Sequence, residues 1–405
     1  MTETVKPGYK QTEVGVIPEE WDYAAIKDVA DIRVGRDLKE DKFSAMGDSI
    51  YRFPVYSNTV AGFGLYGFYS VPEYEGDSLT VVGRGVGLGT AFARTGGYGA
   101  IGRLLVLLPG NRADARFLAT YINQRVSIFV ETGGIPQLTG IQFSKYQVAL
   151  PPLPEQRAIA TALSDVDALL GALNRLIAKK RDLKQAAMQQ LLTGQTRLPG
   201  FHGKWEVKRL EQSCETITKG TTPTSIGRTF TESGVSFLKA ESISESGGPL
   251  PDKIAFIDAT TNKLLKRSQL KEGDLLISIA GVLGRVGRIS KEVLPANTNQ
   301  ALAIVRLGSV SELERNFLFY WLRSPMTVKQ ISDVNVQAAQ ANISLQNVRD
   351  LEIYVPPTRA EQTAIAAVLT DMDAELAALE QRLAKTRALK QGMMQELLTG
   401  RIRLV

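Results

Sequence analysis

The sequence contains a long internal repeat. Residues 155–198 return at residues 361–404, with 26 identities in the 44 aligned positions. A repeat of this length constrains the architecture, because each copy is expected to fold into the same structural unit. We therefore predict two half-molecules in tandem, each ending in the same long helix.

The repeat extends unevenly into the segments that precede each copy. Trp21 matches Trp205 at an offset of 184 residues, whereas Glu155 matches Glu361 at an offset of 206. Each half is thus a globular part with many length changes, followed by a helix with none. Two explanations stay open: loops drift in sequence, or a common scaffold has varied its globular part for function.

The repeated segment has the end signals and spacing of a helix. The first copy is predicted to run from about Pro154 to Leu192, after a proline-rich stretch and before Gly194. The second copy follows Pro356 and stops at Gly400. The a/d spacing predicts that the helices pair through Leu163, Val166, Leu170, Leu173 and Ile177 in the first copy and Leu369, Met372, Leu376, Leu379 and Leu383 in the second.

Pairing alone does not define what the helices do. A helix of ~38 residues spans roughly 57 Å at the rise of an α-helix, between one and two turns of DNA at about 34 Å per turn. The helices could therefore space two DNA contacts, or form a packing coiled coil without that role.

Polar residues interrupt the apolar stripe in both copies. Lys184 and its repeat Lys390 fall on core positions. Such lysines set the register of a helix pair at a cost in stability, or extend outward to solvent, and the sequence leaves both open. Asp167 and its repeat Asp373 are interpreted as first-turn charges that favour a helix N-terminus.

The globular parts are predicted to mix strands with short helices. Helices are expected at 115–124 and 312–322, and strands at 78–82, 103–108, 275–279, 301–306 and 351–355. The predicted fold class is α+β, with two mixed α/β domains joined by two long antiparallel helices and a pseudo-two-fold internal repeat. The expected segments are residues 1–154, 155–198, 199–357 and 358–405.

Composition argues against several classes of function. The chain has one cysteine, Cys214, and one histidine, His202, which cannot form a zinc site at any usual spacing. No dinucleotide fingerprint, Walker A loop or methylase signature is present. No apolar run could span a membrane, and the N-terminus does not resemble a signal peptide, so a cytoplasmic, non-catalytic protein is expected.

Charge permits nucleic-acid binding without requiring it. The net charge of +6 divides as −1 over residues 1–154, +3 over 155–198, +4 over 199–360 and 0 over 361–405. Because DNA affinity draws heavily on phosphate neutralisation, an excess this small predicts weak DNA binding by the chain alone and the need for a partner.

Polar side chains that could read DNA lie in a loop before the last strand of each globular part. These loops span residues 131–140 and 335–344. Gln and Asn pair with adenine, and Arg pairs with guanine or phosphate. The candidates are Thr132, Gln137, Gln337, Gln340 and Asn342 in the loops, with the cations Arg84, Arg94, Lys239, Arg285 and Arg288. The alternative is an ordinary polar loop and solvated cations.

Several motifs resemble one known family. GYKQTEVGVIPEEW at 8–21 is similar to its N-terminal lead, and LPPLPEQRAIATAL at 150–163 and VPPTRAEQTAIAAVL at 355–369 to its helix entries. QQLLTGQTRLPGF at 189–201 and QELLTGRIRL at 395–404 resemble its helix exits. With these residues the chain resembles the DNA-specificity subunit of type I restriction–modification systems. One departure is Thr358-Arg359-Ala360, which replaces the usual proline-rich approach.

The resemblance implies a role for each part. The globular parts would be target recognition domains, each reading one half of a split DNA site, and the helices would set the gap between the half-sites. Two methyltransferase subunits and motor–nuclease restriction subunits would be the protein partners. Adenosylmethionine, ATP and Mg would be bound by those partners and no cofactor by this chain. Because the globular parts differ, the target is predicted to be asymmetric.

Two other functions remain as alternatives. A tandem DNA-modifying enzyme would carry its own methyltransferase or nuclease site, and the purified chain alone would then modify DNA. A coiled-coil scaffold that binds only protein would show no change in DNA preference when the globular parts are exchanged.

Overall fold

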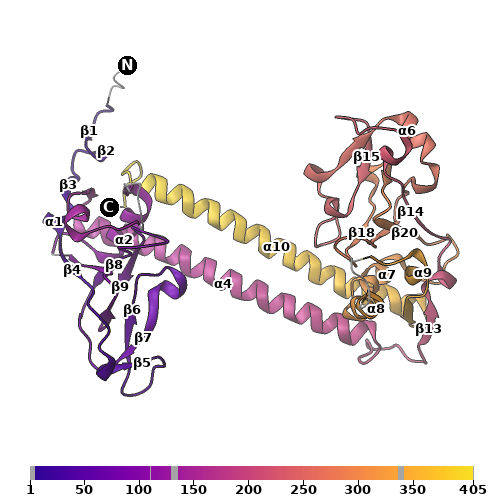
Figure 1. Cartoon of the computed structure of the whole chain (residues 1–405), viewed down its shortest axis with the longest axis horizontal. Coiled ribbons are helices and arrows are strands. Elements are labelled where there is room, and N and C mark those ends of the chain that lie inside the picture. The colour runs from indigo at the N-terminus through magenta and orange to yellow at the C-terminus, as the bar shows by residue number, and fades with distance from the viewer. Residues whose placement is uncertain (1–4, 110, 129–135, 336–341, 405) are drawn as a thin grey trace. The chain divides into compact units, whose positions relative to one another are not determined.

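The computed structural model describes residues 5–109, 111–128, 136–335 and 342–404. The chain forms two compact units, each with one globular part and portions of both long helices (Figure 1). Unit 1 comprises residues 1–174 and 382–405, and unit 2 comprises residues 175–381. The long helices are therefore shared between the two units.

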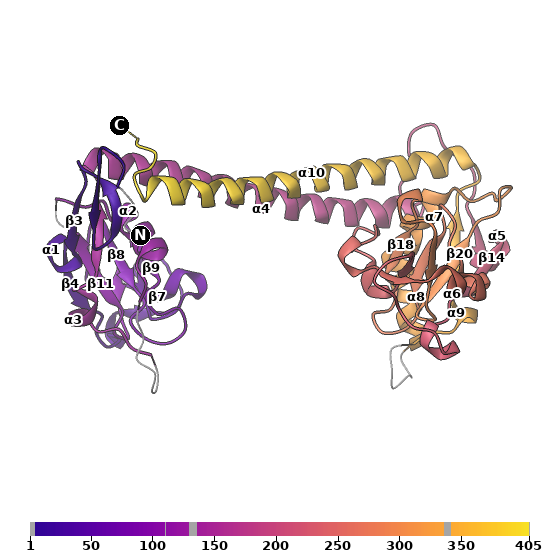
Figure 2. The ribbon, with the colours of Figure 1, turned by 90° about the horizontal axis from the view of Figure 1, so that it is seen from above.

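An antiparallel sheet forms the centre of unit 1. Its strand order is β4 (Ala30–Val34), β11 (Leu105–Pro109), β8 (Ser78–Val81) and β9 (Ala91–Arg94), as seen in Figure 2. Helix α2 (Ala115–Arg125) packs on β8 and β9. Strand residues alternate between the two faces, so one face joins α2 in the core of the unit.

Shorter elements complete unit 1. A second sheet has the order β10 (Gly99–Ala100), β6 (Phe53–Tyr56), β7 (Leu65–Tyr69) and β5 (Phe43–Ser44). The other elements are β1 (Tyr9–Thr12), β2 (Gly15–Pro18), β3 (Asp22–Ala25), β12 (Gln147–Leu150), α1 (Ile26–Val29) and α3 (Gly140–Phe143).

Unit 2 repeats the central sheet and its helix. The strand order is β14 (Thr216–Lys219), β20 (Leu302–Arg306), β17 (Leu275–Ser278) and β18 (Val286–Arg288). Helix α7 (Arg315–Leu322) takes the place of α2. The other elements are β13 (Glu206–Arg209), β15 (Val235–Leu238), β16 (Ala255–Ile257), β19 (Ala296–Thr298), β21 (Glu352–Val355), α5 (Leu210–Ser213), α6 (Ala259–Leu264), α8 (Pro325–Asn335) and α9 (Leu345–Arg349).

The predicted strands and helices of the globular parts are confirmed, with shifted ends. The strands correspond to β8, β11, β17, β20 and β21. The helices are α2 and α7, which begin after Asp114 and Glu314. The Asp114 carboxylate accepts hydrogen bonds from two backbone N–H groups of the first turn, and the Glu314 carboxylate accepts one from Phe317. The Glu314 cap explains why α7 begins at Arg315 and not at Glu312, since capping fixes where a helix begins.

The repeated segments form the long helices α4 (Leu153–Leu192) and α10 (Arg359–Leu397), which lie side by side (Figure 1). In unit 1 the beginning of α4 and the end of α10 share a core that contains Leu163 and Leu397. In unit 2 the end of α4 and the beginning of α10 share a core that contains Leu191 and Leu369. All ten residues predicted to pair the helices are buried or half-buried.

Cross-helix ion pairs occupy the polar positions of the stripe. Lys184 pairs with Asp373 in unit 2, and Lys390 Nζ lies 2.6 Å from Asp167 Oδ1 in unit 1. These are the same pair in the two copies of the repeat, since both members differ by 206 residues. Lys180, before Lys184, pairs with Glu375, after Asp373, which shows that the helices run antiparallel.

This pairing corrects the prediction for the aspartates. Asp167 lies 14 residues after Leu153, where α4 begins, and Asp373 lies 14 residues after Arg359 in α10. The helix dipole acts within the first turn, so a first-turn role is wrong. The carboxylates instead neutralise lysines of the opposite helix.

The repeated Glu-Gln pair ties each helix entry to the exit of the other helix. Glu155, whose side chain is 1% exposed, accepts hydrogen bonds from Arg403 Nε at 2.6 Å and Nη2 at 2.8 Å. Trp21 Nε1 donates to the same carboxylate at 3.1 Å. Beside it, the Gln156 side chain accepts from the backbone N–H of Asp114 at 2.9 Å, which fixes the start of α2.

The same arrangement recurs in unit 2. Arg197 donates through Nη2 to Glu361 at 2.7 Å, and Gln362 accepts from the backbone N–H of Glu314 at 2.7 Å. One difference is that the indole N–H of Trp205, the match of Trp21, has no hydrogen-bond partner within the described residues. The repeated motif therefore has a structural role in joining helix and globular part.

Replacing Arg403 with alanine should destabilise the chain by about 3 kcal/mol, because a buried carboxylate loses its cation. Urea unfolding followed by circular dichroism measures this change. The matched control is Arg401→Ala, which removes an exposed pair with Glu396 and should cost less than about 1 kcal/mol. Equal effects of the two substitutions would contradict the structural role of the buried pair.

Candidate nucleic-acid interface

Three strand ends of the central sheet meet at one edge of unit 1. Leu105, the first residue of β11, pairs with Val34 at the end of β4 and with Val81 at the end of β8. The segments that follow β4, precede β11 and follow β8 therefore lie next to one another. These segments and the adjoining chain contribute four residues, which we call edge 1: Arg36, Arg84, Arg103 and Gln137.

Arg84 and Gln137 are brought together by backbone pairing. They form an isolated antiparallel β-bridge. Leu138 donates its N–H to the Gly83 carbonyl at 2.8 Å, and Gly85 donates to the Pro136 carbonyl at 3.1 Å. Both side chains are exposed, so two residues predicted from different segments share one surface.

Arg36 and Arg103 join this surface through a neighbouring turn. Gly102 donates its N–H to the Arg36 carbonyl at 3.1 Å. Asn58 connects the turn to the Arg84 segment, because its side chain accepts from Gly83 N at 2.8 Å and donates to the Gly102 carbonyl. Sequence analysis missed these two arginines. The sequence signal that could have indicated them is a glycine followed by an arginine next to a predicted strand, as in Gly35-Arg36 and Gly102-Arg103.

The arginines of edge 1 are exposed. No carboxylate within the described residues forms an ion pair with Arg36, Arg84 or Arg103. Unpaired guanidinium groups clustered on one surface are typical of sites that bind phosphate or base edges.

Unit 2 places uncharged polar residues at an equivalent edge. Ala280 forms a β-bridge with Asn342, and Ile343 donates its N–H to the Ile279 carbonyl at 2.9 Å, as Leu138 does to Gly83. Gln300 precedes β20 by the same spacing as Arg103 precedes β11. We call the residues Thr222, Gln300 and Asn342 edge 2; Thr222 donates its N–H to Gln300 Oε1 at 3.1 Å.

Arg94 lies inside unit 1, away from any surface role. Its exposure is 7%, its Nε donates to Thr80 Oγ1 at 2.9 Å, and its Nη2 donates to the Phe63 carbonyl at 2.7 Å. The guanidinium also lies 3.5 Å from the ring centre of Tyr56. Burial lowers the pKa of Arg94. The predicted phosphate or guanine contact is therefore corrected to a structural role, because the guanidinium is engaged within the core.

The other predicted cations lie outside edge 2. Arg285 donates to the carbonyls of Ala240 and Ile243, at 3.2 and 3.3 Å. Lys239 is half-buried, with its Nζ 4.7 Å from the ring centre of Phe230. Arg288 is exposed beside a groove of unit 2. The predicted residues Thr132, Gln337 and Gln340 lie outside the described residues.

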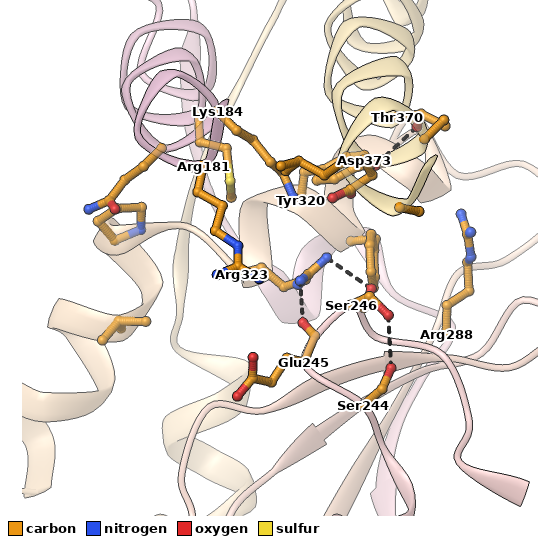
Figure 3. A pocket seen from close by; sticks show the side chains of 18 of the residues that line it. Arg181, Lys184, Ser244, Glu245, Ser246, Arg288, Tyr320, Arg323, Thr370 and Asp373 are labelled. Carbon is orange, nitrogen blue, oxygen red and sulfur yellow. Dashed lines mark hydrogen bonds and ion pairs between the residues drawn. The ribbon is translucent and has the colours of Figure 1, made fainter. Parts of the chain in front are cut away.

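A groove of about 1240 Å³ lies between the globular part of unit 2 and the helix pair (Figure 3). The guanidinium groups of Arg288 and Arg323 lie 5.2 and 4.8 Å from the ring centre of Phe319. Arg323 donates to the backbone carbonyls of Glu245, at 2.5 Å, and Ser246, at 3.2 Å. Burial lowers the pKa of Arg323.

The helix side of the groove joins both long helices. Tyr320 donates its hydroxyl hydrogen to Asp373 Oδ2 at 2.9 Å, and Asp373 also binds Lys184 from α4. Burial raises the pKa of Tyr320 to about 12. The groove therefore combines aromatic and arginine side chains, which are enriched at protein interfaces, with charged residues of both long helices.

Within the residues described here, no group of three or more His, Cys, Asp and Glu side chains could hold a metal ion. Across the same residues, no helix combines the length and apolar character needed to cross a bilayer.

Comparisons with known proteins agree with the architecture. A curated relative, the putative type I restriction enzyme MjaX specificity subunit of Methanocaldococcus jannaschii, is 25% identical over 98% of this chain and 97% of its own length. The EcoBI specificity subunit of Escherichia coli is 23% identical over 63% of this chain and 57% of its own length.

Solved structures show the same fold. The crystal structure of a type I restriction-modification S subunit from M. genitalium matches with a TM-score of 0.63 and 14% identity, covering 93% of this chain and 96% of that one. A chain from a study of complex assembly and conformational transition of the type I R-M system matches with a TM-score of 0.57 and 19% identity, over 95% of this chain and 99% of that one.

A family model also matches both halves of the chain. The type I restriction modification DNA specificity domain matches residues 18–180 and 202–386. Each match covers one globular part and most of the long helix that follows it. The chain therefore belongs to the family of type I restriction–modification specificity subunits.

Proposed function

We propose that this chain is the non-catalytic DNA-recognition subunit of a type I restriction–modification complex, in which each unit reads one half of a split site. The observation that carries this function is the pair of equivalent, exposed sheet edges. Both are held by the same backbone pairing, yet one presents three arginines and the other neutral polar side chains. Base edges are read by such side chains from fixed backbone positions.

The difference between the edges supports an asymmetric target. Two identical surfaces would select the same bases in both half-sites. Arginine forks and amide groups match different donor and acceptor patterns in the major groove. Edge 1 and edge 2 therefore select different half-sites, and the antiparallel helix pair sets the gap between them.

The partners follow from the chemistry that the chain lacks. Two methyltransferase subunits dock on the helix pair and the adjoining globular parts, and motor–nuclease subunits join for cleavage. Adenosylmethionine, ATP and Mg belong to those subunits. The groove of unit 2 supports a protein contact there, because it borders α4, α10, α7 and α8.

Exchanging the globular part of unit 1 for that of another family member should change one half of the methylated sequence and leave the other half unchanged. Adenine methylation is mapped genome-wide in cells that carry the chain and its methyltransferase. Two identical inverted half-sites would contradict the asymmetric target. Methyl transfer by the purified chain alone would favour the tandem-enzyme alternative.

Removing one heptad from each helix, residues 172–178 and 378–384, should shorten the gap between the half-sites. This double deletion keeps Lys184 opposite Asp373 and Lys390 opposite Asp167, because both pairs shift by the same amount. The methylated motif is mapped as before. The control exchanges the two heptads, ALNRLIA and ALEQRLA, which preserves length and should preserve the gap. An unchanged gap in the deletion would refute the spacing role.

Val328→Arg should reduce recovery of the methyltransferase with the tagged chain by at least about tenfold, because a charge in a packed interface without a partner is costly. Val328 is 54% exposed and lines the groove. The control is Val310→Arg in the same unit, at a position that is 94% exposed and outside the groove. Full recovery with Val328→Arg would place the methyltransferase elsewhere.

A further inference from the structure

Edges 1 and 2 occupy equivalent places in the repeat but differ in the chemistry that they present. The first residues of β11 and β20, Leu105 and Leu302, differ by 197 residues. Two residues before them stand Arg103 and Gln300 respectively. The backbone hydrogen bond from Leu138 to the Gly83 carbonyl in unit 1 corresponds to the one from Ile343 to the Ile279 carbonyl in unit 2. The two edges therefore share this backbone pairing but differ in the turn before the central strand, because Gln300 lacks the left-handed φ of Arg103.

Arg103 has a backbone conformation that residues with side chains rarely adopt. Its φ is +66°, within the left-handed region, and the preceding Gly102 has φ of +65°. A non-glycine residue in this region costs free energy and persists only where its surroundings hold it. Here the hydrogen bonds from Gly102 N to the Arg36 carbonyl and from the Asn58 amide to the Gly102 carbonyl hold the turn. Gly102 adopts the same left-handed conformation at little cost, because glycine has no side chain.

A fixed backbone matters because base reading by arginine depends on direction. The guanidinium fork reaches guanine O6 and N7 together in the major groove, whereas a phosphate contact tolerates many orientations. Arg84 is fixed in a similar way by the bridge to Gln137. Neither arginine has an ion-pair partner within the described residues, so both forks are available to a ligand.

We propose that Arg103, assisted by Arg84, reads a guanine in the half-site of unit 1. The proposal rests on the proposed function, in which unit 1 contacts DNA bases. Edge 2 has a glutamine at the equivalent position, and its Oε1 already accepts from Thr222. The guanine contact through this position is therefore confined to one half of the target, and the two half-sites differ there.

The test uses the complex of the full chain with its methyltransferase subunit and a pool of random-sequence double-stranded DNA, whose bound fraction is sequenced. The wild-type complex should enrich a split motif with a guanine in one half. Arg103→Lys keeps the positive charge but lacks the fork, and Arg103→Gln introduces the residue of edge 2. Both should lower the preference for that guanine by roughly five- to 150-fold and leave the other half unchanged.

A matched control and separate outcomes keep the proposal distinct from the function on which it rests. Arg116→Lys changes another exposed arginine of unit 1, which pairs with Asp114, and should leave the motif unchanged. Thermal melting by circular dichroism confirms that each variant is folded. A split motif that both Arg103 variants preserve overturns the guanine assignment alone. If the wild-type complex enriches no split motif, the proposed function fails as well.

Discussion

The pairing of α4 with α10 depends on a constraint that the apolar stripe alone cannot supply. A heptad stripe packs almost equally well after a slip of seven residues, because every seventh position is similar. The two lysine–aspartate pairs remove this ambiguity. In one slipped register, Lys184 would face Ala366 and Lys390 would face Ala160, which leaves both lysines unpaired. In the other, Lys184 would face Glu380 but Lys390 would face Asn174, so only one of the two pairs is kept. Unpaired polar groups at core positions are costly, so the observed register is selected.

The buried carboxylates then connect this register to the globular parts. Glu155 binds Arg403 beyond the end of α10, and the neighbouring Gln156 fixes the start of α2. The repeat places Glu361, Arg197 and Gln362 in the same relation in unit 2. Helix register, helix entry and the helix that packs on the central sheet are thus coupled by hydrogen bonds. Each set of contacts closes within its own unit, although it takes one residue from each copy of the repeat.

Sequence reasoning succeeded where periodicity and repetition determine structure. The long helices and the strands β8, β11, β17 and β20 follow from apolar spacing and from turn residues at their ends. It failed where the result depends on which distant segments meet. Asp167 is of a residue type that favours the first turn of a helix, but its partner Lys390 is more than 200 residues away in sequence. Arg94 and Arg103 are both arginines near glycines, and only the tertiary structure shows that one is buried and the other exposed.

The contrast between these two arginines shows how a common scaffold separates stability from recognition. Arg94 lies at the end of β9, where its guanidinium holds the Phe63 carbonyl and the Tyr56 ring inside the unit, so substitution there would act through folding. Arg103 lies in a turn outside the sheet, and its side chain is exposed. The sheet edge can therefore vary its side chains while the strand pairs beneath it stay the same. This separation explains why the two edges differ in side-chain chemistry, whereas the residues that join helix to globular part recur in both halves.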